Sequence, residues 1–172
     1  MAERILLGRL TIKIIKGDHL HDTKVMQRMD PYVKVTSLDP ESLQLNWRTK
    51  IDKNGGKNPK WHDEERTMDV YDLHDKLHFQ LFDEDNLTKD DFIGEMRHSI
   101  KQLMNHEGEH AFDLVRQGGK NAGKLVLHIK SERLVHPREA ILDCEAKLVI
   151  VNEKKQKVAG SQEAIDAHLA EA

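Results

Sequence analysis

Carboxylates gather in two short stretches of this chain. A segment of the form Asp-x-Asp-x5-Asp brings three of them close together, at Asp83, Asp85 and Asp91. A second stretch begins at Asp22 and ends at Asp30. Carboxylate oxygens are the ligands that hard divalent cations prefer, and calcium takes about six to eight of them. The two stretches together indicate a calcium-binding site.

Short runs of alternating apolar and polar residues predict half-buried strands in the rest of the chain. The clearest are 10–14, 32–35, 77–81 and 125–129, and weaker runs at 46–52, 65–71, 92–100 and 109–115 bring the number to eight. Turn signals such as Asn54-Gly55-Gly56 separate them, and Ile100–Met104 is expected to form a helical turn. Eight strands at this spacing predict an all-β fold, an antiparallel β-sandwich.

The predicted sandwich would bring the two acidic stretches together. When strands alternate in direction, the connections after the first and the fifth strand leave the fold at the same end. Five negative charges there would raise one another's pKa unless a cation neutralised them. Two calcium ions would supply four positive charges, and backbone carbonyls, water or a lipid phosphate would complete their coordination. The predicted ligands are Asp22, Asp30, Asp83, Asp85 and Asp91.

Composition favours a cytoplasmic protein that reaches membranes only peripherally. The 172 residues include one cysteine, Cys144, which excludes an internal disulfide framework. No apolar run approaches the roughly 20 residues that span a bilayer, and the first residues lack the apolar core of a signal peptide. With 27 basic and 30 acidic residues, the net charge of −3 produces no overall attraction to nucleic acid or lipid. We therefore expect no nucleic-acid partner.

The pattern changes after about residue 134, which divides the chain into a sandwich domain, 1–134, and a C-terminal extension, 135–172. Residues 135–148 are consistent with a helix, and Lys147 to Val151 predicts a further strand. Ser161 is expected to cap a final helix. The extension is therefore expected to be partly helical. It would serve either as a strap packed on the domain or as a docking segment for a protein partner.

Two features that suggest an enzyme carry little weight. His106-Glu107-Gly108-Glu109-His110 satisfies the His-Glu-x-x-His pattern, but zinc protease chemistry needs both histidines on one face of a stable helix. Here glycine separates them and a strand pattern follows at once. The lone Cys144 lies outside the predicted sandwich. We find no catalytic residues and expect a non-enzymatic protein.

A second, basic surface is predicted on two strands. Tyr32 and Lys34 share the outward face of one strand, and Arg48 and Lys50 share a face of another. If the strands are neighbours, the four side chains form a cationic patch with an aromatic edge, which suits phosphate groups. The alternative is an ordinary solvated strand face.

Four ordered motifs resemble the C2 domain, the calcium and phospholipid binding sandwich of protein kinase C and synaptotagmin. The motifs are Gly8-Arg9-Leu10-Thr11-Ile12-Lys13-Ile14, Asp30-Pro31-Tyr32-Val33-Lys34-Val35, Asn58-Pro59-Lys60-Trp61, and the stretch from Asp83-Glu84-Asp85 to Gly94. The resemblance covers roughly residues 6–133. The opening Gly-Arg-Leu strand and the closing Gly123-Lys124-Leu125 are similar to the circular variant, in which the last strand takes the place of synaptotagmin's first. The first loop is similar to that of plant-type members.

The resemblance implies roles for individual residues. Asp22 and Asp30 match first-loop calcium ligands, Asp83, Asp85 and Asp91 match third-loop ligands, and Asp90 matches a loop-supporting position. Val25, Met26 and Leu87 match apolar tips that enter the lipid interface, and Tyr32, Lys34, Arg48 and Lys50 match a headgroup-binding surface for phosphatidylserine or phosphoinositide. The first loop departs from the family pattern at Gln27, where a small residue is usual, and this puts the position of Asp22 in doubt.

The expected function is calcium-dependent, peripheral binding to anionic phospholipid membranes in signalling. An alternative at the level of the residues is that Asp30 and Asp83 only cap turns and that Asp22 is a solvated loop residue. The corresponding alternative function is a calcium-independent interaction scaffold that acts through the extension, 135–172.

Overall fold

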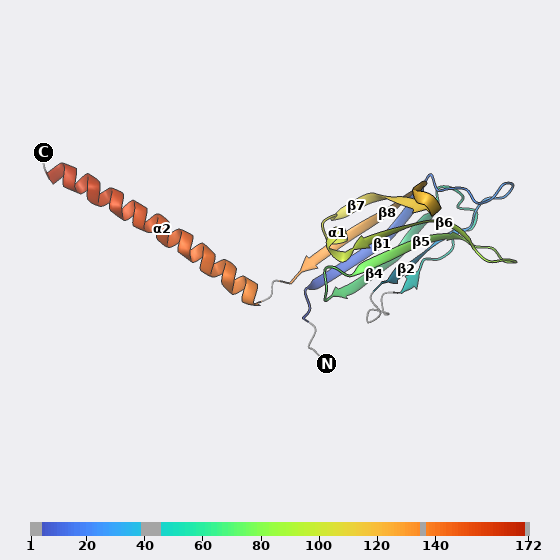
Figure 1. Cartoon of the computed structure of the whole chain (residues 1–172), viewed down its shortest axis with the longest axis horizontal. Helices are drawn as coiled ribbons and strands as arrows, with labels where there is room; N and C mark the ends of the chain where they lie inside the picture. The colour runs from blue at the N-terminus through green and yellow to red at the C-terminus, as the bar shows by residue number, and fades with distance from the viewer. Residues whose placement is uncertain (1–4, 39–45, 135–136, 171–172) are drawn as a thin grey trace. The chain divides into compact units, whose positions relative to one another are not determined.

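The computed structural model describes residues 5–38, 46–134 and 137–170, and the chain divides into two compact units, Met1–Leu134 and Val135–Ala172. The first unit holds all eight strands (Figure 1). They are β1 (Gly8–Asp18), β2 (Pro31–Ser37), β3 (Trp47–Arg48), β4 (Lys60–Val70), β5 (Lys76–Asp83), β6 (Asp91–Ser99), β7 (Gly108–Arg116) and β8 (Lys120–Arg133). Helix α1 (Ile100–Met104) follows β6, and the 3-10 turn η2 (Gln117–Gly119) follows β7.

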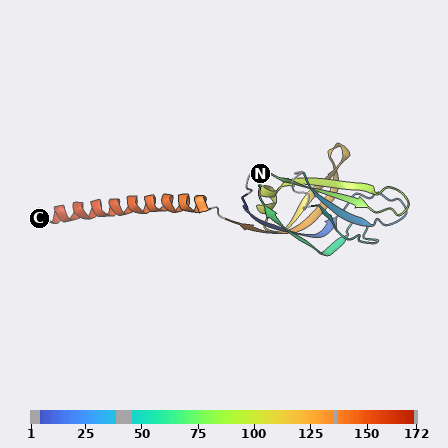
Figure 2. The ribbon, with the colours of Figure 1, turned by 90° about the horizontal axis from the view of Figure 1, so that it is seen from below.

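The strands form one curled antiparallel sheet in the order β3-β2-β5-β6-β7-β8-β1-β4. Strands β6 and β7 share a single ladder pair, Glu95 with Val115, whereas their other neighbours pair along most of their length. The sheet therefore divides at this point into two four-stranded halves (Figure 2). The predicted eight-stranded antiparallel fold is confirmed.

The core explains why the alternating runs became strands. Inward residues such as Leu10, Ile12 and Phe79 are fully buried, while Thr11 and Lys13 between them are partly exposed. Because successive side chains of a strand point to opposite faces, each run contributes one buried row. Burial of a large apolar side chain stabilises the fold by about 1.5–3 kcal/mol, so these rows hold the two halves together.

The predicted strand at 46–52 is much shorter in the structure, where β3 contains only Trp47–Arg48. The buried Thr49 explains why pairing stops. Its side-chain hydroxyl accepts the backbone N–H of Val33 at 3.0 Å, in the place where a regular ladder would supply a carbonyl.

The predicted turn at Ile100–Met104 is confirmed as α1. Ser99 and Gln102 cap the N-terminus of this helix with a capping box.

The second unit is one continuous helix, α2 (Pro137–Ala170). The predicted strand at Lys147–Val151 is therefore wrong, and so is the predicted N-cap at Ser161, whose hydroxyl donates to the carbonyl of Lys157 inside the helix at 2.8 Å. A run of β-branched residues forms a strand only beside other strands, because strand preference depends on cross-strand packing. Among the described residues, no helix is both long and apolar enough to cross a bilayer.

Three loops gather at one end of the first unit, on the right in Figure 1. They are residues 19–30, 49–59 and 84–90, the connections after β1, β3 and β5. Backbone hydrogen bonds join them: Leu20 N–H donates to Lys57, Gly56 N–H to Met29, and Glu84 N–H to Asp30. The sandwich thus brings the two acidic stretches together, as expected, and adds the loop 49–59 beside them. We call residues 19–30, 49–59 and 84–90 the first, second and third loops.

Gly123 keeps the start of the first loop close to β8. It has a φ of 101°, and a Cβ at this position would lie 2.6 Å from the carbonyl oxygen of His19. We predict that Gly123→Ala lowers the free energy of unfolding by about 2 kcal/mol or more, since it adds a steric clash to a strained backbone. Gly118→Ala is the matched control, because Gly118 also has a positive φ but no atoms crowd its Cβ position. Equal losses for both variants in urea unfolding would contradict the close approach.

Candidate functional site

The buried carboxylate of Asp83 joins the first and third loops at the centre of the loop end. It lies at the last position of β5 and is fully buried. One oxygen accepts the backbone N–H of Asp30 at 2.7 Å, and the other accepts the hydroxyl of Thr23 at 2.8 Å. A buried carboxylate needs such donors, because an unpaired charge is costly away from water. Asp83 thus fixes where the other aspartates stand.

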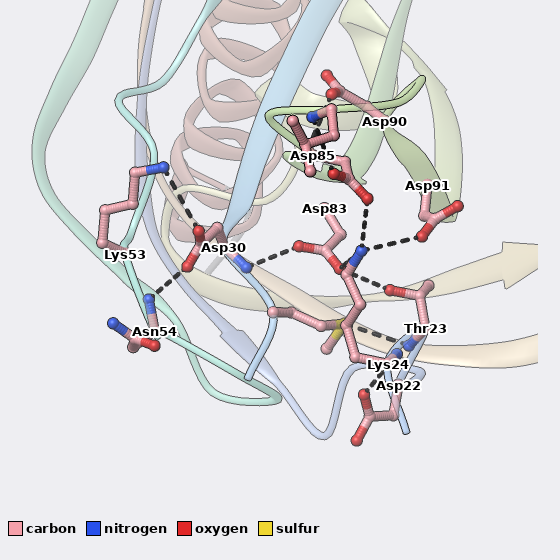
Figure 3. A network of polar contacts seen from close by, with 12 residues as sticks. Asp22, Thr23, Lys24, Asp30, Lys53, Asn54, Asp83, Asp85, Asp90 and Asp91 are labelled. Atoms are coloured by element: carbon pink, nitrogen blue, oxygen red, sulfur yellow. Dashed lines mark hydrogen bonds and ion pairs between the residues drawn. The ribbon is translucent and has the colours of Figure 1, made fainter. Parts of the chain in front are cut away.

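Three carboxylates converge on one ammonium group, that of Lys24 (Figure 3). Its Nζ lies 3.1 Å from Asp85, 3.3 Å from Asp91 and 3.6 Å from Asp83. We call Asp83, Asp85 and Asp91 the acidic cluster. The hydrogen bond from Lys24 to Asp85, together with the charges around it, raises the pKa of Lys24 above its ordinary value. Lys24 therefore acts as a tethered counter-cation of the acidic cluster.

Backbone donors organise the third loop around Asp85 and Asp90. The N–H of Leu87 donates to Asp85 at 3.2 Å, and this bond, followed by the one from Lys24, lowers the pKa of Asp85 to about 2. Asp90 accepts the Tyr32 hydroxyl at 2.7 Å and the N–H of Asp85 at 3.1 Å, and both bonds lower the pKa of Asp90. Both carboxylates therefore stay ionised at neutral pH, and Asp90 supports the loop from the side.

The carboxylate of Asp30 is bound by residues of the loop 49–59, whereas its backbone N–H is bound by Asp83 of the acidic cluster. Its carboxylate accepts the backbone N–H of Asn54 at 2.7 Å and lies 3.4 Å from Nζ of Lys53. Lys53 also contacts Glu84 of the third loop. Asn54 has a φ of 59°, a left-handed conformation that asparagine tolerates better than most residues. This turn aims the N–H of Asn54 at Asp30.

Asp22 stands apart from the other predicted ligands. Its carboxylate accepts the N–H of Lys24 at 3.1 Å and lies 3.5 Å from Nζ of Lys57. The dashed contacts in Figure 3 join Asp22 to its own loop and not to the acidic cluster. The structure thus brings Asp83, Asp85 and Asp91 together, holds Asp30 beside them through Asp83, and leaves Asp22 at the edge.

Sequence reasoning missed the three residues that make the strongest contacts to these carboxylates, Thr23, Lys24 and Lys53. A signal was present for Lys24, which is a basic residue two positions after Asp22 in the first loop. Nothing in the sequence indicated Lys53, because the loop that carries it is far from both acidic stretches along the chain.

The donor set of this end suits a hard cation. The carboxylates of the acidic cluster and the hydroxyl of Thr23 offer only oxygen, and the ammonium of Lys24 already stands where a cation would be placed. Within residues 5–38, 46–134 and 137–170, no group of three or more acidic, histidine or cysteine side chains stands in an arrangement ready to hold a metal. Calcium would thus require Lys24 to move.

Apolar side chains project from the tips of the same loops. Val25, Met26 and Leu87 are each more than 90% exposed, whereas most large apolar residues of the sandwich are buried. Val25 and Met26 follow Lys24 in the first loop, and Leu87 follows Asp85 in the third. The predicted insertion residues therefore lie next to the acidic cluster and in contact with solvent.

The predicted basic surface forms on β2 and β3. Lys34 and Arg48 are exposed and directly opposite each other in the ladder, and Lys50 is exposed just beyond the end of β3. Arg48 stacks on the ring of Tyr32, with its guanidinium carbon 5.7 Å from the ring centre. We call Lys34, Arg48 and Lys50 the basic patch.

Tyr32 differs from the exposed aromatic edge that the sequence suggested. It is only 8% exposed and its ring stacks on Phe82, because β2 runs close to β5 at this point. Burial, and then the bond to Asp90, raise the pKa of Tyr32 to about 12. Its hydroxyl is thus a neutral donor already engaged by Asp90, and the ring supports Arg48 from beneath.

The His-Glu-x-x-His segment does not lie on a helix. His106 follows α1, and His110 lies inside β7. Their rings touch edge to face at 5.2 Å between centroids. One ring nitrogen of His106 is hydrogen-bonded to the carbonyl of Gln102, and one of His110 to the carbonyl of Glu107. The helix that a zinc protease needs to place both histidines on one face is therefore lacking in this segment.

Comparisons with known proteins place this fold in a family. A family model for the C2 domain matches residues 8–114. The E3 ubiquitin-protein ligase NEDD4 of Mus musculus is 38% identical over 86 residues, which are 49% of this chain and 10% of that protein. The 16 kDa phloem protein 1 of Cucurbita maxima is 26% identical over 135 residues, 74% of this chain and 80% of that one. This chain thus corresponds to a tenth of the ligase but to most of the phloem protein.

Solved structures agree at the level of the fold. The C2A domain of plant Extended Synaptotagmin 1 superposes with a TM-score of 0.65 at 20% identity, covering 77% of this chain and all of that one. The C2A and C2B domains of Extended-Synaptotagmin 2 give 0.62 at 24% identity, covering 78% and 44%. Because the family model spans more than half of the sequence and the fold agrees with it, the chain belongs to the C2 domain family, whose members commonly bind membranes or lipids.

Proposed function

We propose that this protein binds anionic phospholipid membranes peripherally and in a calcium-dependent manner, and that it does so without catalysis. The observation that carries this proposal is the convergence of Asp83, Asp85 and Asp91 on a single cation beside exposed apolar tips. A site that binds one ammonium with three carboxylates has the charge and the oxygen donors for a divalent ion.

Calcium would enter by exchange with Lys24. Its ammonium is held by side-chain contacts alone and stands on a flexible four-carbon stem, so it can swing into solvent without a backbone change. Asp83, Asp85 and Asp91 would then hold the ion, with Asp30 next to them on the Asp83 side. Calcium supplies the charge neutralisation, and the chain's own residues supply the position.

The charge change would act as the trigger for membrane binding. The three loops, with Asp83 and Asp91 at their margins, carry a small excess of negative charge: eight carboxylates, at Asp22, Asp30, Asp52, Asp83, Glu84, Asp85, Asp90 and Asp91, against six basic side chains, at Lys24, Arg28, Lys50, Lys53, Lys57 and Lys89. Such a surface is repelled by anionic lipid. Bound calcium would cancel much of the excess and let Val25, Met26 and Leu87 enter the interface, each with up to about 1.5–3 kcal/mol of burial.

The basic patch would provide a second contact with the membrane. Each lysine or arginine near an anionic surface contributes on the order of 1 kcal/mol. Arg48 already lies over the ring of Tyr32, which would reduce the entropy lost when it binds a headgroup. Phosphatidylserine and phosphoinositide headgroups both offer the anionic oxygens that this surface suits.

A second candidate function has its own support. Lys24 and Lys53 already pair with Asp83, Asp85, Asp91, Asp30 and Glu84, so the loop end is partly neutralised by the chain itself. A domain of this kind would be stable without calcium and would act as a calcium-independent interaction scaffold, with α2 as its docking segment. In that case, binding to vesicles would not respond to calcium.

We predict that phosphatidylserine vesicles sediment the wild-type protein with calcium but not with chelator, and that Asp85→Asn/Asp91→Asn loses this response. The variant keeps the shape of both side chains and removes charge-assisted contacts, so calcium should bind at least roughly tenfold more weakly. Asp69→Asn is the matched control, because it removes an exposed charge that pairs with Arg9 at the opposite end of β1. Equal sedimentation under all conditions would contradict the switch and favour the scaffold.

Removal of the tethered cation tests the exchange directly. Lys24→Met keeps an unbranched apolar stem and removes the competing charge, so the affinity for calcium should rise by roughly two- to fivefold in calorimetric titration, which is the range expected for a partly exposed ion pair. Lys57→Met is the matched control, since Lys57 contacts Asp22 and not the acidic cluster. An unchanged or weaker affinity in Lys24→Met would show that calcium does not compete with Lys24.

The basic patch can be tested apart from calcium. Lys34→Ala/Arg48→Ala should weaken binding to phosphoinositide vesicles by roughly tenfold or more, because two cations are lost. Lys130→Ala/Lys13→Ala removes the same number of charges from β8 and β1, in the other half of the sheet, and should have a smaller effect. Similar losses in both pairs, measured at a fixed calcium concentration, would mean that general charge and not this surface binds the headgroup.

A further inference from the structure

An apolar line runs along α2. Its members follow one another in alternating steps of three and four residues, which is the spacing of a coiled-coil seam. We call this line the helix seam: Leu148, Val151, Lys155, Val158, Gln162, Ile165 and Leu169. Every residue of the helix seam is exposed, including its five apolar members at 48–73%. The seam continues for three heptads with only two polar interruptions.

A helix of this composition is not expected to be stable alone. Most helical stability in proteins comes from packing of an apolar face, and isolated helices are marginal in water. The sequence of α2 adds the β-branched Val149, Ile150 and Val151 and the flexible Gly160, which all lower helix propensity. Within the second unit, no described side chain from residue 145 to residue 170 is covered by another part of that unit. The helix seam therefore needs a partner to cover it.

We propose that the partner is a second copy of this chain, and that two α2 helices pack antiparallel through the helix seam. The spacing of the seam is symmetric about Gly160: from Val151 to Leu169 the steps are four, three, four, three and four. A reversed copy therefore presents matching positions along the whole contact. Val151 would face Leu169 of the second copy, Lys155 would face Ile165, and Val158 would face Gln162.

The charges of α2 favour this direction. Within the contact from Val151 to Leu169, the half before Gly160 carries Lys154, Lys155 and Lys157 against Glu153, and the half after Gly160 carries Glu163 and Asp166. An antiparallel copy places the basic half beside the acidic half, whereas a parallel copy would place like charges side by side and Lys155 against itself. The helix dipoles also oppose each other only in the antiparallel arrangement. Charge thus complements the match in spacing.

The two polar seam residues limit the assembly to two helices. Leucine followed by β-branched residues along a seam can favour larger bundles. In a four-helix assembly, however, Lys155 and Gln162 would be enclosed, and an enclosed unpaired charge such as that of Lys155 is strongly destabilising. Between two helices, both side chains reach solvent at the margin of the seam. The dimer is therefore the expected state.

The mass of the 172-residue chain in solution tests the assembly. The chain has a mass of 19.9 kDa, and sedimentation equilibrium at tens of micromolar should give twice this value. Val158→Glu/Ile165→Glu should raise the dissociation constant by roughly a hundredfold or more, since it places charge in the seam. Val149→Glu/Ile150→Glu is the matched control: it makes the same change to two exposed apolar residues of α2 that lie outside the seam, and it should leave the dimer intact.

Several outcomes would overturn the proposal. They are a monomeric wild-type protein, a trimer or larger assembly, and equal dissociation of the seam and control variants. Wild-type protein that stays monomeric and gains helix only on anionic vesicles would assign the seam to lipid instead. Thermal unfolding of the sandwich, followed by its sheet signal, should be the same for all variants, which separates loss of assembly from loss of fold.

Cross-linking tests the direction. In a Cys144→Ser background, a mixture of Val151→Cys and Leu169→Cys chains should form mixed disulfide dimers under mild oxidation, because these positions face each other in the antiparallel pair. Val151→Cys alone should remain largely uncross-linked. Efficient cross-linking of Val151→Cys to itself, without mixed dimers, would show a parallel pair and overturn the antiparallel assignment.

Discussion

The loop end of this domain depends on one buried carboxylate, that of Asp83. It accepts a backbone N–H from the end of the first loop and a hydroxyl from its middle, while its own backbone closes β5. Two loops that are distant in sequence are therefore held by a single charged group that burial alone would disfavour. The placement of Asp85, Asp91 and the exposed apolar tips follows from this anchor. The need to pair the buried charge of Asp83, rather than apolar packing, determines the arrangement of the loops at this end of the sandwich.

The same demand gives the lysines their importance. A cluster of carboxylates cannot remain close together without positive charge, and Lys24 supplies it from within the first loop. Calcium at this site would therefore replace an existing cation instead of filling a vacant position. The same geometry could therefore respond to calcium or be independent of it, depending on whether calcium or the ammonium of Lys24 occupies the site. The two proposed functions, calcium-dependent membrane binding and a calcium-independent scaffold, therefore rest on the same set of contacts.

The sequence could predict the fold well, because strand alternation and the order of four motifs are local signals. Asp83, Asp85 and Asp91 could be predicted as a group for the same reason, because they lie close together along the chain, in and beside one loop. The neighbours of Asp30 could not, because Lys53 and Asn54 reach it through the pairing of β2 with β3. Tyr32 was misjudged as an exposed edge because alternation does not show that Phe82 and Asp90 enclose it. In α2, the run Leu148 to Val151 favoured a strand, but strand preference counts for little without a neighbouring strand.

Tyr32 connects the basic patch with the acidic cluster through a series of direct contacts. Arg48 rests on the Tyr32 ring, Tyr32 donates to Asp90, and Asp90 accepts the backbone N–H of Asp85. The basic patch and the acidic cluster are thus the two ends of one short chain of contacts. An ion that moves Asp85 and a headgroup that binds Arg48 would therefore act on the same four residues, Arg48, Tyr32, Asp90 and Asp85. Thermodynamic linkage then requires reciprocity: whatever factor the ion adds to lipid affinity, the lipid adds to the affinity for the ion.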